Sequence, residues 1–171
     1  ILDYFATSDQ ATPLTLTNHS YFNLSGDLKT TIHHHRVKMD SSHFLELDHN
    51  LIPTGRKVNV SGTTFDFREG RMLRDGFRND EEQHKLAGNG YDHYFLFSKK
   101  SHAEIEVKDF DSGRIMSIHT NQPGVVMYTS NQLKNGLELR EGQSRKYLGV
   151  CFETQGSPAS LHHDGLESII L

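Results

Sequence analysis

The chain has 171 residues, of which 35% are hydrophobic, and its formal net charge is -4. This length suffices for one domain or for a large piece of a bigger one. No apolar run approaches the roughly 20 residues that cross a bilayer, and the 18 basic residues are spread along the chain rather than concentrated in one stretch. We therefore expect a soluble chain that binds neither a membrane nor nucleic acid and that takes a small or neutral ligand.

The single cysteine, Cys151, excludes an internal disulfide and a structural zinc site built on cysteine pairs. The fold must therefore rest on burial and hydrogen bonds, and a cytoplasmic location fits this composition best. The chain also has twelve histidines, an unusually large number for its length. Histidine moves protons readily near neutral pH, although most of these residues are expected to be ordinary surface groups.

Apolar and polar residues alternate along much of the chain, which is typical of strands that are buried on one face. The turn-forming residues 111–113 predict a hairpin between the strands 103–108 and 114–120. Helical patterns are limited to residues 71–77 and to residues 81–86, which glycines end. Other short strands are predicted at residues 2–6, 14–17, 34–39, 44–47, 94–97, 125–129 and 146–153. The pattern predicts an all-β fold, a β-sandwich in one continuous domain.

Three segments combine reactive side chains with aromatic and amide residues, and each offers two interpretations. His19 is either a general acid held by its neighbours or a structural histidine at the end of a strand. Asp92 either accepts a hydrogen bond from a sugar hydroxyl or caps a turn. Glu153 ends an apolar run, so burial would raise its pKa towards that of a useful base; otherwise it is an exposed carboxylate where the strand leaves the sheet.

Strand alternation places Cys151 on the same face as Glu153, as a packing residue beside the site rather than a nucleophile. The run of histidines at 33–35 is a poor metal site because consecutive strand residues point to opposite faces. No glycine-rich phosphate loop is present, so a nucleotide cofactor has no sequence signature.

Six motifs, in this order along nearly the whole chain, resemble those of the aldose 1-epimerases, the galactose mutarotases. They are TNHSYFNL at 17–24, LIPTG at 51–55, FDFR at 65–68, GYDH at 90–93, QPGV at 122–125 and FETQ at 152–155. The resemblance implies a large antiparallel β-sandwich that interconverts the α and β anomers of free hexoses such as galactose or glucose, without a metal or cofactor. It also implies that Glu153 is the base and His19 the acid, that Asp92 binds a sugar hydroxyl, and that Ser20 and Tyr21 line the site.

The chain departs from the family pattern in two respects. Family members are about twice as long, and their N-terminal half supplies an arginine and a second histidine that have no counterpart here. The chain begins at Ile1 without a methionine and ends at Leu171 in strand-like sequence. We therefore expect residues 1–171 to be the C-terminal portion of a single domain, whose partner is the missing N-terminal half of the same protein. Val126 also stands where many relatives have a glutamine, which bears on the preferred sugar.

Two other functions remain open at this point. A non-catalytic carbohydrate-binding β-sandwich would keep the fold without the chemistry, although the presence of both His19 and Glu153 argues against it. A sugar-phosphate 1-epimerase of the same fold would need arginines around the site to hold the phosphate. The only dense set of arginines comprises Arg68, Arg71, Arg74 and Arg78.

Overall fold

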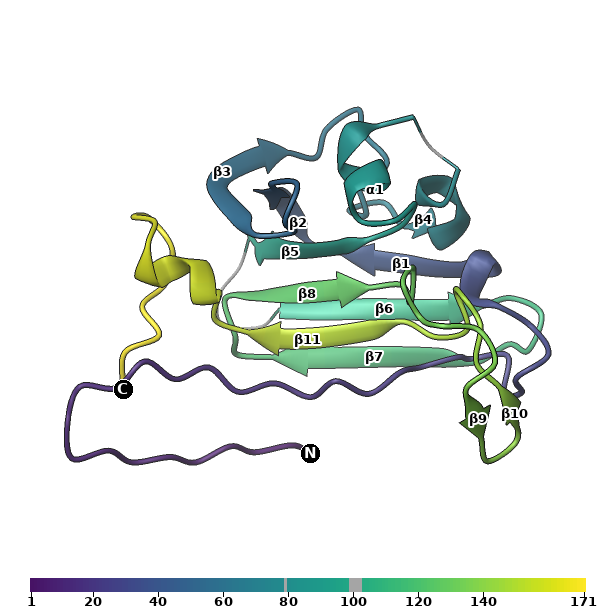
Figure 1. The fold of residues 1–171 in the computed structure, drawn as a ribbon, viewed down its shortest axis with the longest axis horizontal. Coiled ribbons are helices and arrows are strands. Elements are labelled where there is room, and N and C mark those ends of the chain that lie inside the picture. Colours follow the sequence, from purple (N-terminus) through teal and green to yellow (C-terminus); the bar gives the residue numbers. More distant parts are fainter. Residues whose placement is uncertain (79, 99–102) are drawn as a thin grey trace.

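The computed structural model describes residues 1–78, 80–98 and 103–171, and it consists mainly of antiparallel strands. Two larger sheets lie one over the other (Figure 1). The first has the strand order β4 (Arg71–Met72), β1 (His35–Met39), β6 (Ala103–Asp109) and β7 (Ile115–Thr120). The second has the order β11 (Cys151–Gln155), β8 (Gly124–Tyr128), β5 (Asp92–Phe97), β2 (Ser41–Leu47) and β3 (Pro53–Asn59). The predicted antiparallel β-sandwich is confirmed.

Short elements connect these strands. A two-stranded ribbon projects from one end of the molecule (Figure 1), and the helical segments are all between three and five residues long. The ribbon is formed by β9 (Glu138–Leu139) and β10 (Gly142–Gln143); the helical segments are η1 (Ile32–His34), η2 (Leu73–Gly76), α1 (Glu82–Leu86) and η3 (Pro158–Leu161). None of the helices in the described ranges has the length and apolar character that a bilayer crossing requires.

The strongest alternating pattern in the sequence forms the predicted hairpin of β6 and β7. In β6 the side chains of Ile105 and Val107 are fully buried, whereas Glu104 is exposed. The turn is closed by a hydrogen bond from the backbone N–H of Ser112 to Asp109 Oδ2, and Gly113 has a φ of +73°. A left-handed φ of this kind costs glycine nothing, which explains why the chain reverses here.

Side chains from both sheets form one core between them. Phe44, Phe95 and Met127 reach into it from the five-stranded sheet, and Val37 and Ile105 reach into it from the four-stranded sheet. Because strand side chains alternate between faces, the residues between these core positions must point to the other side of the five-stranded sheet. The outer face of this sheet carries the candidate site.

Three strand predictions were wrong or too long. Residues 2–6 and 14–17 are extended but form no strand; near them a single bridge joins Pro13 to Ile170. Backbone hydrogen bonds join Thr12 to Leu171 and Leu14 to Ile169, but these few bonds near the chain ends do not extend into a regular strand ladder. The strand predicted at 146–153 begins only at Cys151, because Tyr147 adopts a left-handed φ of +60°. Conversely, β3 was missed because its charged and glycine residues at the sheet edge hide any apolar alternation.

Candidate active site

The register of the five-stranded sheet sets out the site in two adjacent rows. Asp92 of β5 pairs with Tyr128 of β8, which in turn pairs with Cys151 of β11. Two residues along the strands, Tyr94 pairs with Val126 and Val126 with Glu153. Residues opposite one another in an antiparallel sheet share a face, and residues two apart on one strand do so as well. Asp92, Tyr128, Cys151, Val126 and Glu153 therefore lie on one face, which is the outer one.

His19 reaches this face from an irregular segment rather than from a strand. The segment is fixed beside β11 by paired backbone hydrogen bonds between Phe22 and Val150, at 2.9 and 3.0 Å. The side-chain amide of Asn23 adds a bond to the carbonyl of Leu148 at 2.9 Å. These bonds explain why a residue so distant in sequence from β11 lies over its outer face.

The structure brings His19 and Glu153 into direct contact. Nε2 of His19 lies 3.2 Å from Oε1 of Glu153, and Nδ1 of His19 lies 3.4 Å from Sγ of Cys151. The side chain of Glu153 is only 13% exposed, whereas that of His19 is 51% exposed. Glu153 is therefore not the exposed carboxylate of the alternative interpretation, and His19 faces both a carboxylate and the solvent.

Burial also tunes the carboxyl groups of the site. It raises the pKa of Glu153, an effect that the adjacent His19 partly offsets. The pKa of Asp92 is raised to about 6, first by burial and then by the negative charge of Glu153. Carboxyl groups with raised pKa values accept protons more readily near neutral pH, as a general base must. The sequence predicted this effect for Glu153 but not for Asp92.

Aromatic rings border the pair. The ring of Tyr21 lies 5.1 Å from that of His19, and the ring of Tyr128 lies 6.3 Å from each of them. Tyr21 is 49% exposed, and the neighbouring Ser20 is exposed as well, its N–H bonded to the side chain of Asn18. Tyr128 was not predicted from the sequence; strand alternation within 125–129 was the available signal, but it becomes meaningful only with the register to Asp92 and Cys151.

Val126 gives the site one apolar wall. It lies beside Glu153 in the register and packs against a small buried cluster that contains Leu45, Tyr94 and Ala159. A valine side chain offers no hydrogen-bonding group to a sugar hydroxyl. Val126 therefore leaves this side of the site apolar.

The residues considered for a metal or a phosphate lie elsewhere. His35 accepts the N–H of Leu24 at Nε2, and His33 packs edge-on against the ring of Phe77. Within the described ranges no group of three or more His, Cys, Asp or Glu residues is arranged to hold a metal ion. Arg68 and Arg71 are paired with the carboxylates of Asp66 and Asp75. Arg68 precedes β4 and Arg71 lies in it, in the four-stranded sheet. Neither therefore supports a phosphate site around Glu153.

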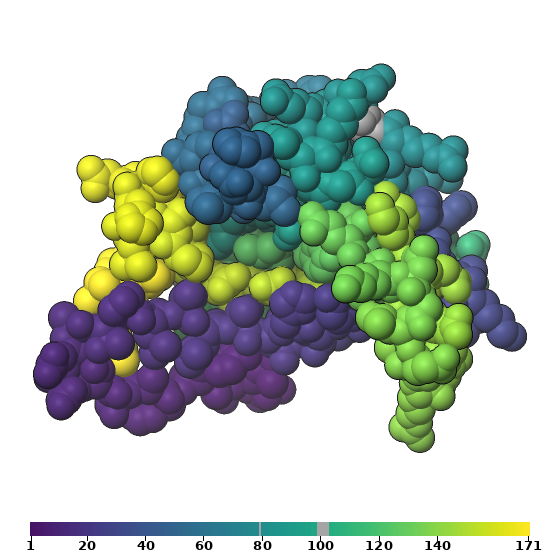
Figure 2. Space-filling model, in the orientation of Figure 1, coloured from purple at the N-terminus to yellow at the C-terminus, as the bar shows by residue number. Residues whose placement is uncertain are grey.

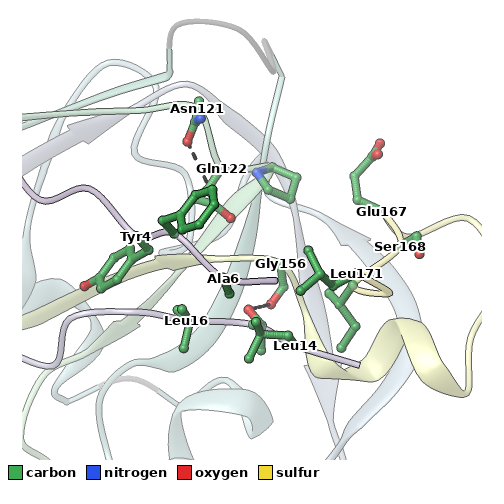
Figure 3. A pocket seen from close by; sticks show the side chains of 14 residues that line it. Tyr4, Ala6, Leu14, Leu16, Asn121, Gln122, Gly156, Glu167, Ser168 and Leu171 are labelled. Atoms are coloured by element: carbon green, nitrogen blue, oxygen red, sulfur yellow. Dashed lines mark hydrogen bonds between the residues drawn. The ribbon is translucent and has the colours of Figure 1, made fainter. Parts of the chain in front are cut away.

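The surface over the two rows is hollowed. In Figure 2 the yellow and green atoms of β11 and β8 lie in a shallow depression between the purple N-terminal segment and the blue residues that follow β2. A separate cavity of about 500 Å³ opens beside the N-terminal segment (Figure 3). Its lining includes Tyr4, Leu16, Gln122 and Leu171 but neither His19 nor Glu153. The candidate site is thus the open depression rather than this second cavity.

The chain is similar to known proteins over nearly its whole length. The family model described as aldose 1-epimerase matches residues 2–171. Human galactose mutarotase is 38% identical over the whole chain, which covers 49% of that protein, and the aldose 1-epimerase of Escherichia coli (strain K12) is 29% identical over 95% of the chain, which covers 47% of it. The chain thus spans about half the length of the curated relatives that it matches.

Solved structures show the same relationship. A GalM/aldose epimerase homologue from C. elegans superposes with a TM-score of 0.81 at 28% identity, over 96% of this chain and 49% of the other. Galactose 1-epimerase from Lactobacillus acidophilus superposes with a TM-score of 0.72 at 29% identity, over 96% of this chain and 46% of the other. Because the family model spans almost every residue and the curated and structural relatives agree, this chain belongs to the aldose 1-epimerase family.

Proposed function

We propose that the protein carrying this chain is an aldose 1-epimerase that interconverts the α and β anomers of a free hexose such as galactose or glucose. The observation that carries the proposal is the contact of 3.2 Å between His19 Nε2 and Glu153 Oε1, in which the carboxyl has a raised pKa. An acid and a base side by side on an open sheet face suit a reaction that moves one proton off the substrate and another onto it.

The reaction follows from these two groups. Glu153 removes the proton of the anomeric hydroxyl, and the released electron pair forms the C1 carbonyl as the bond from C1 to the ring oxygen breaks. His19 donates a proton to the departing ring oxygen. Rotation about the bond from C1 to C2 exposes the other face of the aldehyde, and the same two groups close the ring with their roles reversed. No electrons leave the sugar, so this chemistry balances without a redox partner.

The surrounding residues would hold the sugar. Asp92, once ionised, accepts a hydrogen bond from a sugar hydroxyl, and Ser20 and Tyr21 border the ring beside His19. The rings of Tyr21 and Tyr128 offer apolar surface to the C–H groups of the sugar. We place this activity in the cytoplasm, because a free thiol such as that of Cys151 persists in a reducing compartment.

We also infer that residues 1–171 are the C-terminal portion of one sandwich domain. Support comes from the half-length coverage of the relatives and from large apolar side chains that are exposed near the N-terminus, among them Ile1, Leu2 and Phe5. An N-terminal half would cover such surface and complete the sugar site. A sharp cooperative thermal transition of this chain as a lone monomer would contradict the inference.

Polarimetry on freshly dissolved α-D-galactose tests the proposed reaction. The full protein that carries this chain should accelerate mutarotation, and Glu153→Gln should abolish turnover while sugar binding, measured by calorimetry, is largely retained. Glu141→Gln is the matched control, because Glu141 is exposed in the turn between β9 and β10. A normal rate in Glu153→Gln would refute the assignment of the base. Binding without any acceleration by the unmodified protein would favour the non-catalytic sugar-binding interpretation.

A further inference from the structure

The two ring nitrogens of His19 face two different groups of the same strand. Nε2 faces the carboxylate of Glu153 at 3.2 Å, and Nδ1 faces the thiol of Cys151 at 3.4 Å. Cys151 and Glu153 are two residues apart on β11, so they lie on the same face of the sheet. This spacing lets the two nitrogens of one imidazole contact both side chains. Each nitrogen therefore faces its own polar group: Nδ1 is hydrogen-bonded to the thiol, and Nε2 lies at ion-pair distance from the carboxylate.

We propose that Cys151 is a positioning residue, whose thiol holds the proton of neutral His19 on Nε2, the nitrogen that faces Glu153. This inference rests on the proposed function, since it specifies which nitrogen exchanges protons with the sugar. A neutral imidazole carries one proton, and the nitrogen that keeps it is set by the hydrogen bond at the other nitrogen. A thiol that donates to Nδ1 makes Nδ1 the acceptor and leaves the proton on Nε2.

The alternative tautomer is unfavourable in this geometry. A proton on Nδ1 would point towards the sulfur, and the lone pair of Nε2 would then face the carboxylate oxygen of Glu153 at 3.2 Å. Two acceptors at this distance repel one another unless the carboxyl is protonated. The thiol and the carboxylate thus favour the same tautomer from opposite sides of the ring.

Burial keeps the thiol in the form that this role needs. The side chain of Cys151 is fully buried, and burial, with the negative charges of Glu153 and Asp92, raises its pKa to about 12. The group therefore remains an S–H donor at neutral pH and is a poor nucleophile. When His19 becomes an imidazolium, the sulfur accepts a weak hydrogen bond from Nδ1–H instead, so one thiol serves both states of the acid.

The other groups around His19 do not replace the thiol. Tyr21 and Tyr128 contact the imidazole through their rings, and Asp92 acts on it through its charge. Among the residues that the structure describes, Cys151 is the partner that hydrogen-bonds Nδ1. Removal of the sulfur should therefore weaken the preference for the Nε2–H tautomer, which then rests on Glu153 alone, without removing either reacting group.

Nitrogen NMR on the full protein labelled with ¹⁵N-histidine tests the proposal, with a His19→Asn sample to identify the two signals of that ring. In the unmodified protein with the ring neutral, we expect the pattern of an imidazole protonated at Nε2. Cys151→Ser keeps a donor and acceptor and should keep that pattern. Cys151→Ala should raise the share of the Nδ1–H tautomer, with kcat lowered about threefold to tenfold, the range expected for one neutral hydrogen bond, and KM little changed.

Packing effects are separated by a control in the core. Val125→Ala removes apolar volume from the opposite face of the neighbouring strand β8, so it should lower the melting temperature and leave the His19 signals unchanged. Unchanged ¹⁵N signals in Cys151→Ala, or equal losses in Cys151→Ala and Cys151→Ser, would overturn the proposal. The NMR readout needs no turnover, so it tests the role of Cys151 even if polarimetry refutes the epimerase activity.

Discussion

The protein should lose stability in mild acid because of one buried histidine behind the site. The side chain of His93 in β5 is fully buried, and its ring packs edge-on against Phe44 and Phe65 at 5.3 and 4.8 Å. Nδ1 accepts the N–H of Asp92 at 3.1 Å, so the neutral ring carries its proton on Nε2, which lies 3.2 Å from Oε1 of Gln83. Both nitrogens are thus matched to the neutral form.

Burial, reinforced by the nearby His84, lowers the pKa of His93 from 6.5 to about 3. Between pH 6.5 and about pH 3 the unfolded chain binds a proton at His93 that the folded chain excludes. The contribution of neutral His93 to the free energy of unfolding is therefore complete above pH 6.5 and is lost as the pH falls towards 3. A difference of about 3.5 pKa units corresponds to about 5 kcal/mol over the whole window, and to about 3 kcal/mol by pH 4. Since the free energy of unfolding of a protein is about 5–15 kcal/mol, this loss is a large share of the total stability.

Urea unfolding of the full protein between pH 7.5 and pH 4 measures this effect. His93→Gln cannot titrate, so its free energy of unfolding should fall by about 3 kcal/mol less than that of the unmodified protein over this range, even though it starts lower at pH 7.5. The buried His84 and His35, whose pKa values are also lowered, contribute equally to both proteins. The exposed His49→Gln should behave like the unmodified protein. Equal pH dependence in His93→Gln and the unmodified protein would refute the reasoning.

Three further perturbations test the site and the core. Because the pKa of Asp92 is about 6, KM for galactose should rise as the pH falls through 6, and Asp92→Asn should remove this dependence from pH-dependent polarimetry. Asn23→Ala removes the side-chain bonds to the carbonyls of Leu148 and Thr30 and to the N–H of Ser25 that help to fix the His19 segment, so kcat should fall about tenfold; an unchanged kcat would count against this anchoring. Phe65→Ala should cost about 3–5 kcal/mol in urea unfolding, because the ring is buried and stacked in the core, whereas Phe110→Ala, at an exposed ring, should cost little; similar losses for both would contradict the core assignment.

The regular parts of the fold were predictable because their signals are local. The β6–β7 hairpin combines strict alternation with a glycine turn, and both features act within about twenty residues of chain. Local signals of this kind could not predict the structure of the edge strand β3 or of the N-terminal segment. Whether an extended stretch becomes a strand depends on a neighbour with free hydrogen-bonding groups, and that neighbour comes from elsewhere in the sequence.

The site residues also differ in whether local sequence or only the fold could identify them. The motifs indicated His19, Asp92 and Glu153 through resemblance to a family, but composition and periodicity alone left each of them open between two interpretations. Their meeting depends on the register of three strands and on the bonds that fix the His19 segment to β11. Local alternation placed Cys151 beside the site and was the available signal for Tyr128. The thiol contact with His19 and the place of Tyr128 between Asp92 and Cys151 followed only from the fold.

The burial of Glu153 is what makes the pair suited to a reversible reaction. Ring opening and closure require the acid and the base to exchange roles, so neither group can hold its proton much more tightly than the other. A carboxyl in water releases its proton well below neutral pH, whereas histidine is the side chain whose charge changes near neutrality. Burial on the sheet face raises the pKa of Glu153 above that of a carboxyl in water, and the charge of His19 limits the rise. In the proposed reaction, the exposed side of His19 would leave room for the sugar, and the thiol of Cys151 would hold the other side of the ring in place.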